Sequence, residues 1–518
     1  MSCKTFHAHE HQNHSQLPRL QQTRSSPLVV AKEKVSITVF GASGDLAVKK
    51  LFPALFRLRV EGLIPSDASI FGYARSKLPR EKFESKLTAK IPSGASNEAV
   101  ASFVAQCSYV SGAYDKIEDF TNLRLALEET ERGSASQLRI YYLSLPESTF
   151  ETVCRGIRNV LLPAAGESGV RIVLEKPFGK DTASYLQLSR QLSPLFPETN
   201  YYRIDHYLAK EMIQTIVPLR FSNPMLESTW NSSNICSVEI SFKEKIGTEG
   251  RGGYFDGYGI IRDVVQNHLL QVLALIAMEP PATVDASAIR CSKATVLREV
   301  APARFEECLV GQYGRSLDGK EQGYLEDPTV PAGSKMATYA RFVLHVNTPR
   351  WKGVPFIITA GKALDEQKVE VRMKYRGGTH ATSEKRAALY PGSAGEELVI
   401  RVQPDEAVLL NLNTKLPGLS QQPDDRSLVR TAISLDYKVK YPDVRLPDAY
   451  EQLLLDVFRG DQQRFVGDDE LETSWNIVSP LLHAIERADA APPMIYPFGS
   501  SGPPSSLHFP LSSGQSKL

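Results

Sequence analysis

The stretch RIDHYLAKE, residues 203–211, brings four kinds of reactive side chain close together in the sequence. A carboxylate (Asp205), an imidazole (His206), a phenol (Tyr207) and an ammonium group (Lys210) fall within six positions. If the segment opens a helix, His206 and Lys210 share a face, and the free N–H groups of the helix start favour a bound anion. A solvated charged turn is the alternative, because dense charge is ordinary on protein surfaces.

A second cluster of polar residues lies in GIIRDVVQNHLLQVLALIAMEPP, residues 259–281. The pattern predicts a helix whose beginning carries Arg262, Asp263, Asn267 and His268 and whose body is apolar. The apolar part, LLQVLALIAM, is too short to span a bilayer and is predicted to be a buried helix. A functional histidine and a hydrogen-bonded core histidine are both compatible with this position, since histidine is of intermediate burial.

A glycine-containing turn near the start of the chain is typical of a phosphate-binding site. In VSITVFGASGDLAVKKLFPALFRL, residues 35–40 form an expected buried strand, and helical periodicity follows Leu46. Gly41 and Gly44 lie between them, where glycine lets the backbone approach a pyrophosphate and the next helix offers free N–H groups. The pattern is G-x-x-G-D-L and not the full G-x-G-x-x-G, so a plain strand-to-helix connection is the alternative.

The next expected strand, ASIFGYARSK, ends with Arg75 at the position where an NAD-binding fold places an acid. An arginine there accommodates a 2′-phosphate, which predicts NADP over NAD, with a surface arginine as the alternative. Further strands are expected in LRIYYLSLP and VRIVLEKPFGKD, with helices at 83–90 and 151–161 between strands. This alternation predicts a parallel sheet with Lys176 at its carboxyl edge, where such sheets bind ligands.

From about Asp205 the pattern changes to long strands with glycine turns, as in NICSVEISFKEKIGTEGRGGYFDGYG and EELVIRVQPDEAVLLNLNTK. Fewer helices intervene, which predicts a mainly antiparallel sheet packed on helices. The fold class expected for the whole chain is therefore α/β plus α+β. A Rossmann-like parallel domain comes first, and a larger β+α domain follows it.

The length, charge and cysteine content of the chain limit the number of domains and the classes of binding partner to expect. The chain has 518 residues, a mass of 57.4 kDa, 42% hydrophobic residues and a formal charge of +1. The length predicts two or three domains, and the balanced charge gives no footprint for nucleic acid or an acidic membrane surface. Six cysteines without C-x-x-C spacing indicate reduced thiols, with neither a disulfide framework nor a zinc site expected.

We expect neither end of the chain to fold. Residues 1–34 are rich in His, Gln and Ser and poor in acids, which predicts a disordered arm, with an organellar transit peptide as the alternative. The last three residues, Ser516, Lys517 and Leu518, form the peroxisomal address SKL. They follow a stretch rich in Ser, Pro and Gly that should leave them accessible to an import receptor.

Several long motifs, in order, closely resemble the glucose-6-phosphate dehydrogenase family. They are GASGDLA, FGYARSK, EKPFGKD, RIDHYLAKE, GTEGRGGYFD, GIIRDVVQNHLLQ, GVPF…AGKAL, VQPDEAV and LPDAYEQLLLDVF, spread from about Val35 to Pro503. The resemblance implies oxidation of glucose 6-phosphate at C1 to 6-phosphogluconolactone with reduction of NADP, a reaction of the oxidative pentose phosphate pathway. It also implies a homodimer or tetramer formed through the antiparallel sheets, of which we expect the dimer.

The resemblance also implies roles for individual residues. His268 matches the general base, and Asp205 the carboxylate that orients it. The substrate-binding set is Lys176, His206, Tyr207, Lys210, Glu244, Asp263, Lys362 and Gln403, of which His206, Tyr207 and Lys210 hold the 6-phosphate. The NADP-binding set is Gly41, Ala42, Ser43, Gly44, Asp45, Leu46, Arg75 and Lys176. No metal is expected.

The chain departs from the family pattern at Val48, Ala209, Gly257 and Gln367, none of which removes the expected base or its partner. Ala209 is expected to be harmless if its backbone φ is negative. A second, structural NADP site of eukaryotic members is matched by Lys368, Arg372 and Arg401. It has lost cations at Thr359, Asn411 and Ser501, so we expect that site to be weak or absent.

Two alternatives to this function follow from the same residues. A phosphate-binding set does not identify every sugar hydroxyl, so another hexose 6-phosphate is one alternative. The other alternative is a non-catalytic subunit that escorts an active dehydrogenase, suggested by the departures at Ala209 and Gly257 and by the loss of cations from the second NADP site. The expected division of the chain is an arm at 1–34, an NADP-binding domain at 35–204, a substrate and oligomerisation domain at 205–497, and a flexible tail at 498–518.

Overall fold

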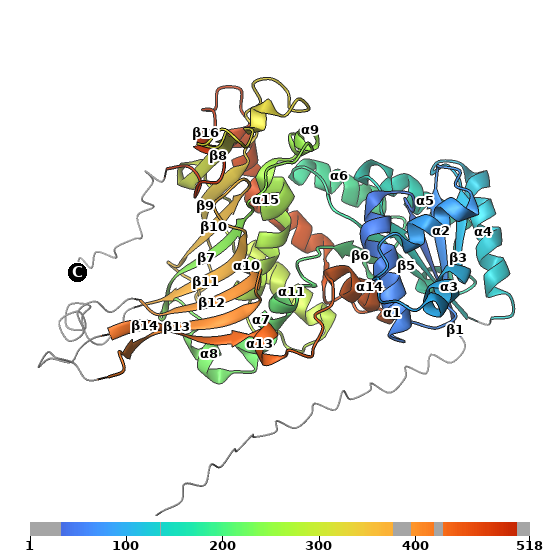
Figure 1. Cartoon of the computed structure of the whole chain (residues 1–518), viewed down its shortest axis with the longest axis horizontal. Helices are drawn as coiled ribbons and strands as arrows, with labels where there is room; N and C mark the ends of the chain where they lie inside the picture. Colours follow the sequence, from blue (N-terminus) through green and yellow to red (C-terminus); the bar gives the residue numbers. More distant parts are fainter. Residues whose placement is uncertain (1–32, 135, 377–394, 419–427, 505–518) are drawn as a thin grey trace, which may run out of the picture.

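The computed structural model describes residues 33–134, 136–376, 395–418 and 428–504. Two sheets with their helices make up the molecule (Figure 1). The predicted arm falls almost entirely outside the described residues, and the carboxyl-terminal SKL lies outside them altogether. Among the described residues, no helix is both long enough and apolar enough to cross a membrane.

The first sheet has seven strands in the order β15-β6-β5-β4-β1-β2-β3. The strands are β1 (Glu33–Phe40), β2 (Ser69–Ala74), β3 (Cys107–Ser111), β4 (Ser136–Leu143), β5 (Val170–Leu174), β6 (Tyr201–Ile204) and β15 (Phe465–Val466). All neighbours are parallel except the short β15, which is antiparallel to β6. The predicted Rossmann-like sheet is confirmed.

Helices cover both faces of this sheet because its strands are apolar on both sides. The helices are α1 (Phe52–Val60), α2 (Arg80–Thr88), α3 (Asn97–Ala105), α4 (Ile117–Glu131), α5 (Phe150–Val160), α6 (Thr182–Leu192) and α14 (Ala449–Arg459). One core joins α1, α2, α3 and α14 to one face, and the other core joins α4, α5 and α6 to the opposite face. Strands that are buried on both faces are characteristic of doubly wound folds.

The second sheet has nine strands in the order β14-β13-β12-β11-β7-β10-β9-β8-β16. They are β7 (Ile235–Lys243), β8 (Cys308–Gly314), β9 (Tyr339–His345), β10 (Pro355–Gly361), β11 (Lys368–Tyr375), β12 (Glu397–Gln403), β13 (Ala407–Lys415), β14 (Leu428–Asp436) and β16 (Met494–Pro497). Only β7–β10 and β8–β16 pair in parallel, so the predicted mainly antiparallel sheet is confirmed.

Helices of the second half lie between the large sheet and the first domain (Figure 1). They include α7 (Glu211–Phe221), α8 (Pro224–Thr229), α10 (Leu270–Ala277), α11 (Ala286–Arg298) and α15 (Asp468–Ile485). Shorter helical turns are α9 (Gly252–Phe255), α13 (Tyr437–Lys440), five 3-10 turns (147–149, 166–169, 198–200, 305–307, 324–326) and two π-helical segments (47–51 and 261–269).

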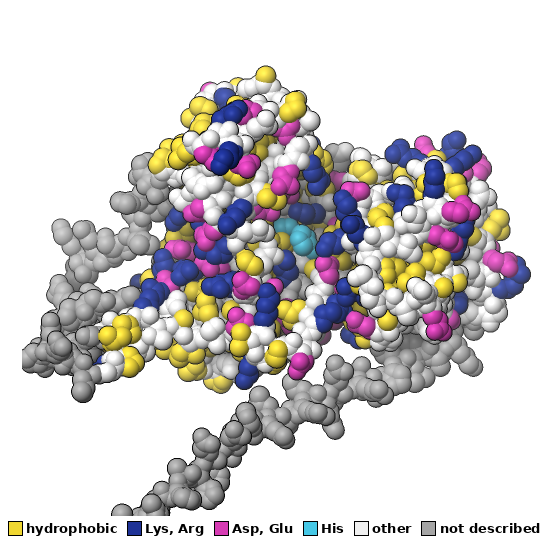
Figure 2. Space-filling view, viewed as in Figure 1, with side chains coloured by type: hydrophobic (Ala, Val, Ile, Leu, Met, Phe, Trp, Pro, Cys, Tyr) yellow, Lys and Arg dark blue, Asp and Glu magenta, His cyan; other side chains and the backbone are white. Residues whose placement is uncertain are grey.

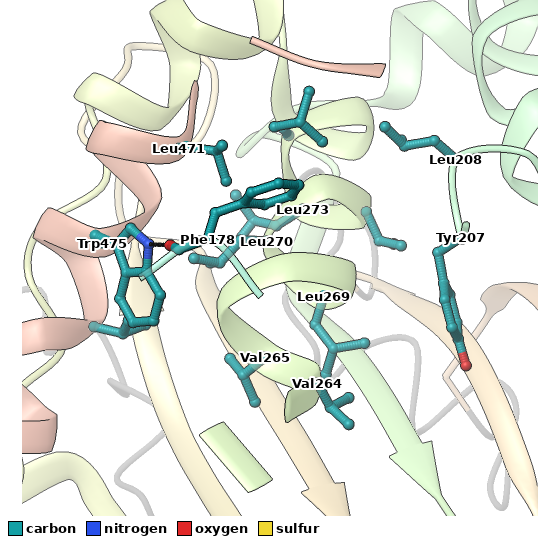
Figure 3. Packing of buried hydrophobic residues seen from close by; sticks show 14 of the residues in the cluster. Phe178, Tyr207, Leu208, Val264, Val265, Leu269, Leu270, Leu273, Leu471 and Trp475 are labelled. Carbon is teal, nitrogen blue, oxygen red and sulfur yellow. Dashed lines mark hydrogen bonds between the residues drawn. The ribbon is translucent and has the colours of Figure 1, made fainter. Parts of the chain in front are cut away.

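The predicted buried helix is confirmed and anchors the site. Every residue of α10 is buried, and the π-helical segment Ile261–Leu269 leads directly into it. Figure 3 shows Leu270 and Leu273 near Phe178, with Leu269 beside Val264 on the other side of the helix. The Trp475 indole N–H donates to the Phe178 carbonyl at 2.7 Å. This contact ties the loop after β5 to α15 and so fixes the backbone that carries Lys176.

Three local expectations differ from the structure. Residues 205–209 form turns, and α7 begins only at Glu211, because the Asp205 carboxylate accepts the Tyr207 N–H at 2.9 Å and holds a turn. The segment 449–466, which we placed in the second domain, packs α14 and β15 onto the first sheet. Part of the expected flexible tail is packed, since the Gly499 N–H donates to the Ala363 carbonyl and Ser500 pairs with Leu364.

Candidate active site

Two segments of the first sheet's carboxyl edge converge on the helix that carries His268. Lys176 follows β5, and residues 205–210 follow β6. The π-helical segment 261–269 brings His268 to the same place from the second half of the chain. Histidine side chains reach the surface where the two halves meet, with Lys and Arg side chains beside them (Figure 2). Ligands of open parallel sheets bind at this edge.

His268 and Asp205 form a buried hydrogen-bonded pair. The imidazole Nδ1 lies 2.5 Å from Asp205 Oδ1, and both side chains are at most 3% exposed. The same carboxylate oxygen accepts the backbone N–H of Tyr207. The Tyr207 ring stacks on the imidazole with centroids 4.2 Å apart. The imidazole is therefore fixed both by its hydrogen bond and by its neighbouring ring, with Nε2 directed away from Asp205.

The protonation states of this pair follow from opposed effects. Burial would raise the pKa of Asp205, but the charge and hydrogen bond of His268 outweigh it and lower that pKa to about 2. Burial lowers the pKa of His268 from its usual 6.5, with Lys176 in support and Asp205 in opposition. Because both pKa values are lowered, Asp205 is ionised and His268 is neutral at neutral pH. A neutral imidazole that donates from Nδ1 carries its lone pair on Nε2.

Lys176 lies directly at that lone pair. Its Nζ is 3.2 Å from His268 Nε2, 2.7 Å from the Asp263 carbonyl and 3.3 Å from Asp263 Oδ1. Burial would raise the pKa of Asp263, but the charges of Lys176 and Lys362 lower it. Lys176, Asp263 and Lys362 also line a cavity of about 300 Å³ together with Tyr254 and Arg251. This volume is at the lower end of small-molecule sites.

The remaining substrate-binding candidates form close pairs around this centre. Lys210 Nζ donates to Gln403 Oε1 at 2.6 Å and lies 5.1 Å from the centre of the Tyr207 ring. Lys362 Nζ and Glu244 Oε2 are 2.6 Å apart. Burial lowers the pKa of Lys210, which still lies among the cationic groups of the site. The structure thus brings the predicted substrate-binding residues into one region, which also contains His268.

Burial keeps His206 neutral at the position where the sequence predicts contact with the 6-phosphate. Burial lowers its pKa well below 6.5, with further lowering from the charges of His268, Lys176 and Lys210. Its ring lies 4.6 Å from that of His268 and is parallel to the Tyr450 ring at 6.3 Å. A neutral imidazole still donates one N–H, so His206 can contact an anion by a hydrogen bond.

Glu175 and Tyr450 are parts of the site that the sequence reasoning did not select. The Tyr142 hydroxyl donates to buried Glu175, and burial raises the pKa of Glu175 to about 7 against the opposing hydrogen bonds of Tyr142 and Tyr450. Tyr450 in turn lies under His206. Both residues belong to the motifs EKPFGKD and LPDAYEQLLLDVF, so the signal was present, but only the fold shows that α14 returns to this edge.

The predicted cofactor turn has the geometry that a dinucleotide phosphate needs. Gly41 has φ +80°, and a Cβ there would lie 2.2 Å from the Ser144 carbonyl oxygen. Gly44 donates to the Gly41 carbonyl at 2.9 Å, which closes the turn before the helical residues 47–60. Ala42, Ser43, Asp45 and Leu46 complete it. Glycine is therefore required at position 41 by the close packing of Ser144, and the turn lies between a strand and a helix start, where dinucleotide-binding folds place the pyrophosphate.

Arg75 follows β2 directly, beside this turn in the parallel sheet. Its guanidinium lies 5.7 Å from the Tyr114 ring centre and makes no ion pair with a described residue. It is exposed, as a group that binds a 2′-phosphate must be. Asp45 is also exposed, and its pKa is lowered by a hydrogen bond from Lys49. The residues present thus fit an NADP molecule.

Asp205, His206 and His268 are the one described group of His, Cys, Asp or Glu side chains close enough to share a metal ion, with ligand atoms within 4.8 Å of one another. Lys176 lies 3.2 Å from His268 Nε2, and a cation at this distance opposes a metal ion electrostatically. The described cysteines, all free, are Cys107, Cys154, Cys236, Cys291 and Cys308.

Two family models match nearly the whole chain. "Glucose-6-phosphate dehydrogenase, NAD binding domain" matches residues 38–215, and "Glucose-6-phosphate dehydrogenase, C-terminal domain" matches residues 217–516. A glucose-6-phosphate 1-dehydrogenase of Saccharomyces cerevisiae is 47% identical over 474 residues, which cover 90% of this chain and 91% of the relative. That of Aspergillus niger is 45% identical over 491 residues, with 94% of each chain covered.

Solved structures agree with these relatives. A glucose-6-phosphate dehydrogenase in complex with glucose 6-phosphate has a TM-score of 0.85 and 43% identity, and the match covers 92% of this chain and 96% of that one. A glucose-6-phosphate 1-dehydrogenase from Mycobacterium avium has a TM-score of 0.77 and 29% identity, with 91% and 96% covered. With both domains matched and identity well above 30% over nine-tenths of its length, this chain belongs to the glucose-6-phosphate dehydrogenase family.

Proposed function

We propose that this protein oxidises glucose 6-phosphate at C1 to 6-phosphogluconolactone and reduces NADP to NADPH. The observation that carries the proposal is the neutral, buried His268, with Nδ1 on Asp205 and a lone pair on Nε2. Family membership supports the reaction, and the glycine turn with Arg75 supports NADP as the cofactor.

In this mechanism His268 removes the proton from the C1 hydroxyl. When bound, NADP supplies the acceptor for the hydride that leaves C1 as the C1–O bond becomes a carbonyl. His268 Nε2 takes the hydroxyl proton, and ionised Asp205 stabilises the resulting imidazolium through Nδ1, as a carboxylate does in a hydrolase triad. One proton and one hydride leave the sugar, which balances formation of the lactone and NADPH.

Lys176 and the charged pairs around it align the sugar. We assign His206, Tyr207 and Lys210 to the 6-phosphate, where N–H and ammonium donors suit an anion. Glu244, Asp263, Lys362 and Gln403 are assigned to the sugar hydroxyls or the phosphate. Lys176 Nζ, next to Nε2, is placed to contact both the C1 hydroxyl and the cofactor. Such alignment can supply several kcal/mol of the barrier reduction.

The same pocket chemistry also fits the nearer alternative, another hexose 6-phosphate. Comparing kcat/KM for glucose 6-phosphate and galactose 6-phosphate with purified protein distinguishes the two substrates. We expect glucose 6-phosphate to be preferred by at least about tenfold, because hydroxyls paired with buried polar groups are strongly discriminated. Equal values for the two sugars would contradict the assignment.

Two of the three features that suggest the escort alternative, Ala209 and Gly257, give it no support by their geometry; the third is the loss of cations from the second NADP site. Ala209 is buried and is not among the described non-glycine residues with positive φ, so its turn does not require glycine. A Cβ on Gly257 would make only an ordinary contact, 3.5 Å from the Tyr254 carbonyl oxygen. Formation of NADPH by the purified protein would exclude an escort role, and its absence would favour one.

We further propose that the chain acts as a homodimer in a peroxisome-like organelle. The dimer proposal rests on the family resemblance, which implies an interface formed by the antiparallel sheets, here the nine-stranded sheet. The address is the SKL terminus, Ser516 to Leu518, which an import receptor would read. A light-scattering mass of one subunit, or unchanged organellar targeting after deletion of Leu518 from a fluorescent fusion, would contradict the respective proposal.

A further inference from the structure

A small cavity lies against Asp205, next to the substrate cavity, with which it shares Lys176, Arg262 and Asn267. It has a volume of about 20 Å³. Most of its wall is apolar and comes from Phe178, Ile204, Val466, Leu471 and Trp475. A space of this size holds one water molecule if enough polar groups face it.

Two complementary polar atoms of this wall have no hydrogen-bond partner within the described chain. Asp205 Oδ2, the carboxylate oxygen not used by His268, is buried and unpaired. Gln266 Nε2, an amide donor on the same π-helical segment as His268, is also buried and unpaired. Both side chains are at most 5% exposed, so bulk water does not satisfy them. An unpaired charged oxygen in such a place is costly.

The other polar and charged residues of the wall already have partners. Lys176 Nζ contacts the Asp263 carbonyl and His268 Nε2, and the Arg262 guanidinium pairs with Glu486. The Asn267 amide donates to the Arg262 and Asp263 carbonyls and accepts the His268 N–H. Gln271 Oε1 accepts from buried Lys293. Asp205 Oδ2, an acceptor, and Gln266 Nε2, a donor, are therefore the two groups of the wall that still lack a partner among the described residues.

We infer that Gln266 is a positioning residue for the reaction and that it acts on Asp205 Oδ2 through one buried water molecule. The water donates to the carboxylate and accepts from the Gln266 amide. This second support holds the carboxylate in plane with the imidazole and stabilises its ionised form, so that Nε2 keeps its lone pair. The inference rests on the proposed roles of His268 and Asp205.

Loss of the Gln266 amide donor should shift the pH dependence of activity in a predictable direction. The competent state of the pair is ionised Asp205 with neutral His268, and it carries one more negative charge than the protonated pair. A donor to Oδ2 favours the competent state, so its removal makes the pair take up a proton more readily. The apparent pKa on the acidic side of the activity profile should therefore rise.

The test is Gln266→Met, which keeps the length of the side chain and removes the donor. We expect kcat to fall about tenfold, the KM for glucose 6-phosphate to stay within twofold, and the acidic limb to move up by roughly one pH unit. Gln266→Asn, which retains a donor within reach of an enlarged water site, should restore part of both changes. Gln137→Met at the amino end of β4, whose Oε1 is likewise buried and unpaired, is the matched control and should leave the profile unchanged.

An unchanged kcat and pH profile in Gln266→Met would overturn the inference. A crystal structure of the wild-type protein gives a readout that does not depend on the variant. It should contain one ordered water within hydrogen-bond distance of Asp205 Oδ2 and Gln266 Nε2, and a dry cavity would also overturn the inference. The water can be seen even in a protein inactive on glucose 6-phosphate, so failure of the proposed function and failure of this inference are distinguishable.

Discussion

At the scale of single residues, burial sets the chemistry of the site more than net charge does. His206 and His268 are both held neutral by burial, while Asp205 remains ionised because His268 and the Tyr207 N–H stabilise its charge. A base must be neutral before it accepts a proton, and a carboxylate must be ionised to stabilise the imidazolium that results. The ligand-free site already provides both.

The pH dependence of the reaction follows from these states. Because burial lowers the pKa of His268 below 6.5, activity should be constant through neutral pH and be lost only as the pH falls through that lowered value. The measurement is kcat/KM against pH, corrected for titration of the sugar phosphate itself. The midpoint belongs to the His268–Asp205 pair. An acidic limb centred above pH 7 would contradict the neutral base.

Arg75 should decide between the two dinucleotides. Arg75→Ala removes a cation that no described carboxylate neutralises, so we expect kcat/KM for NADP to fall about 10- to 100-fold. The value for NAD, which lacks the 2′-phosphate, should change little. Arg124→Ala, on the exposed side of α4, is the control and should alter neither cofactor. Equal losses with NADP and NAD would mean that Arg75 does not recognise the 2′-phosphate.

At the scale of elements, turns and helix ends place the reactive groups. The helix that carries His268 is π-helical over residues 261–269, and Asn267 bridges its widened turn to the Arg262 and Asp263 carbonyls. Such segments occur frequently at functional sites. The glycine turn after β1 has the same positioning role in the proposed cofactor site.

The Gly41 turn can be tested against a second glycine with similar φ. Gly41→Ala and Gly62→Ala both place alanine at positive φ, which should cost about 1–3 kcal/mol of unfolding free energy each. At Gly41 the new Cβ also clashes with the Ser144 carbonyl, whereas nothing lies within 4 Å at Gly62. Only Gly41→Ala should therefore raise the KM for NADP strongly. A similar KM in both variants would show that the turn does not hold the cofactor.

Sequence reasoning found the elements more reliably than their ends. The strands β1 and β2 and the buried helix α10 were predictable because their apolar patterns are local. RIDHYLAKE was not a helix start, because Asp205 captures the Tyr207 N–H, a competition that spacing alone does not reveal. The contact of Lys176 with His268 joins residues 92 apart in the sequence, and no local pattern predicts such a contact. Only the family resemblance grouped these residues.

At the scale of the whole molecule, segments from the second half of the sequence return to the first domain and hold the two domains together. The first domain ends at β6, yet α14 and β15 return from the second half to complete its layers. Tyr450 on α14 reaches under His206, and Trp475 on α15 holds the loop of Lys176. The active site therefore depends on both domains, and neither half contains it alone.

The second NADP site should be weak in this protein. Two of its three remaining cations are already paired, Lys368 with Glu366 at 3.0 Å and Arg372 with Glu370 at 2.9 Å. Asn411, in place of a cation, lies 3.4 Å from Glu397. Titration of purified protein with NADP should therefore give one site per subunit at micromolar concentration. Two such sites per subunit would refute this prediction.

The most direct test of the whole account is the rate of NADPH formation from glucose 6-phosphate by the wild-type protein and by His268→Asn. We expect the wild type to be active and the variant to lose roughly 10²- to 10⁴-fold in kcat, with the KM changed little, because only the proton transfer is removed. His345→Asn is the matched control, since His345 also pairs with a carboxylate, Glu307 at 3.2 Å, but lies in β9. A His268→Asn variant with wild-type kcat would contradict the central claim.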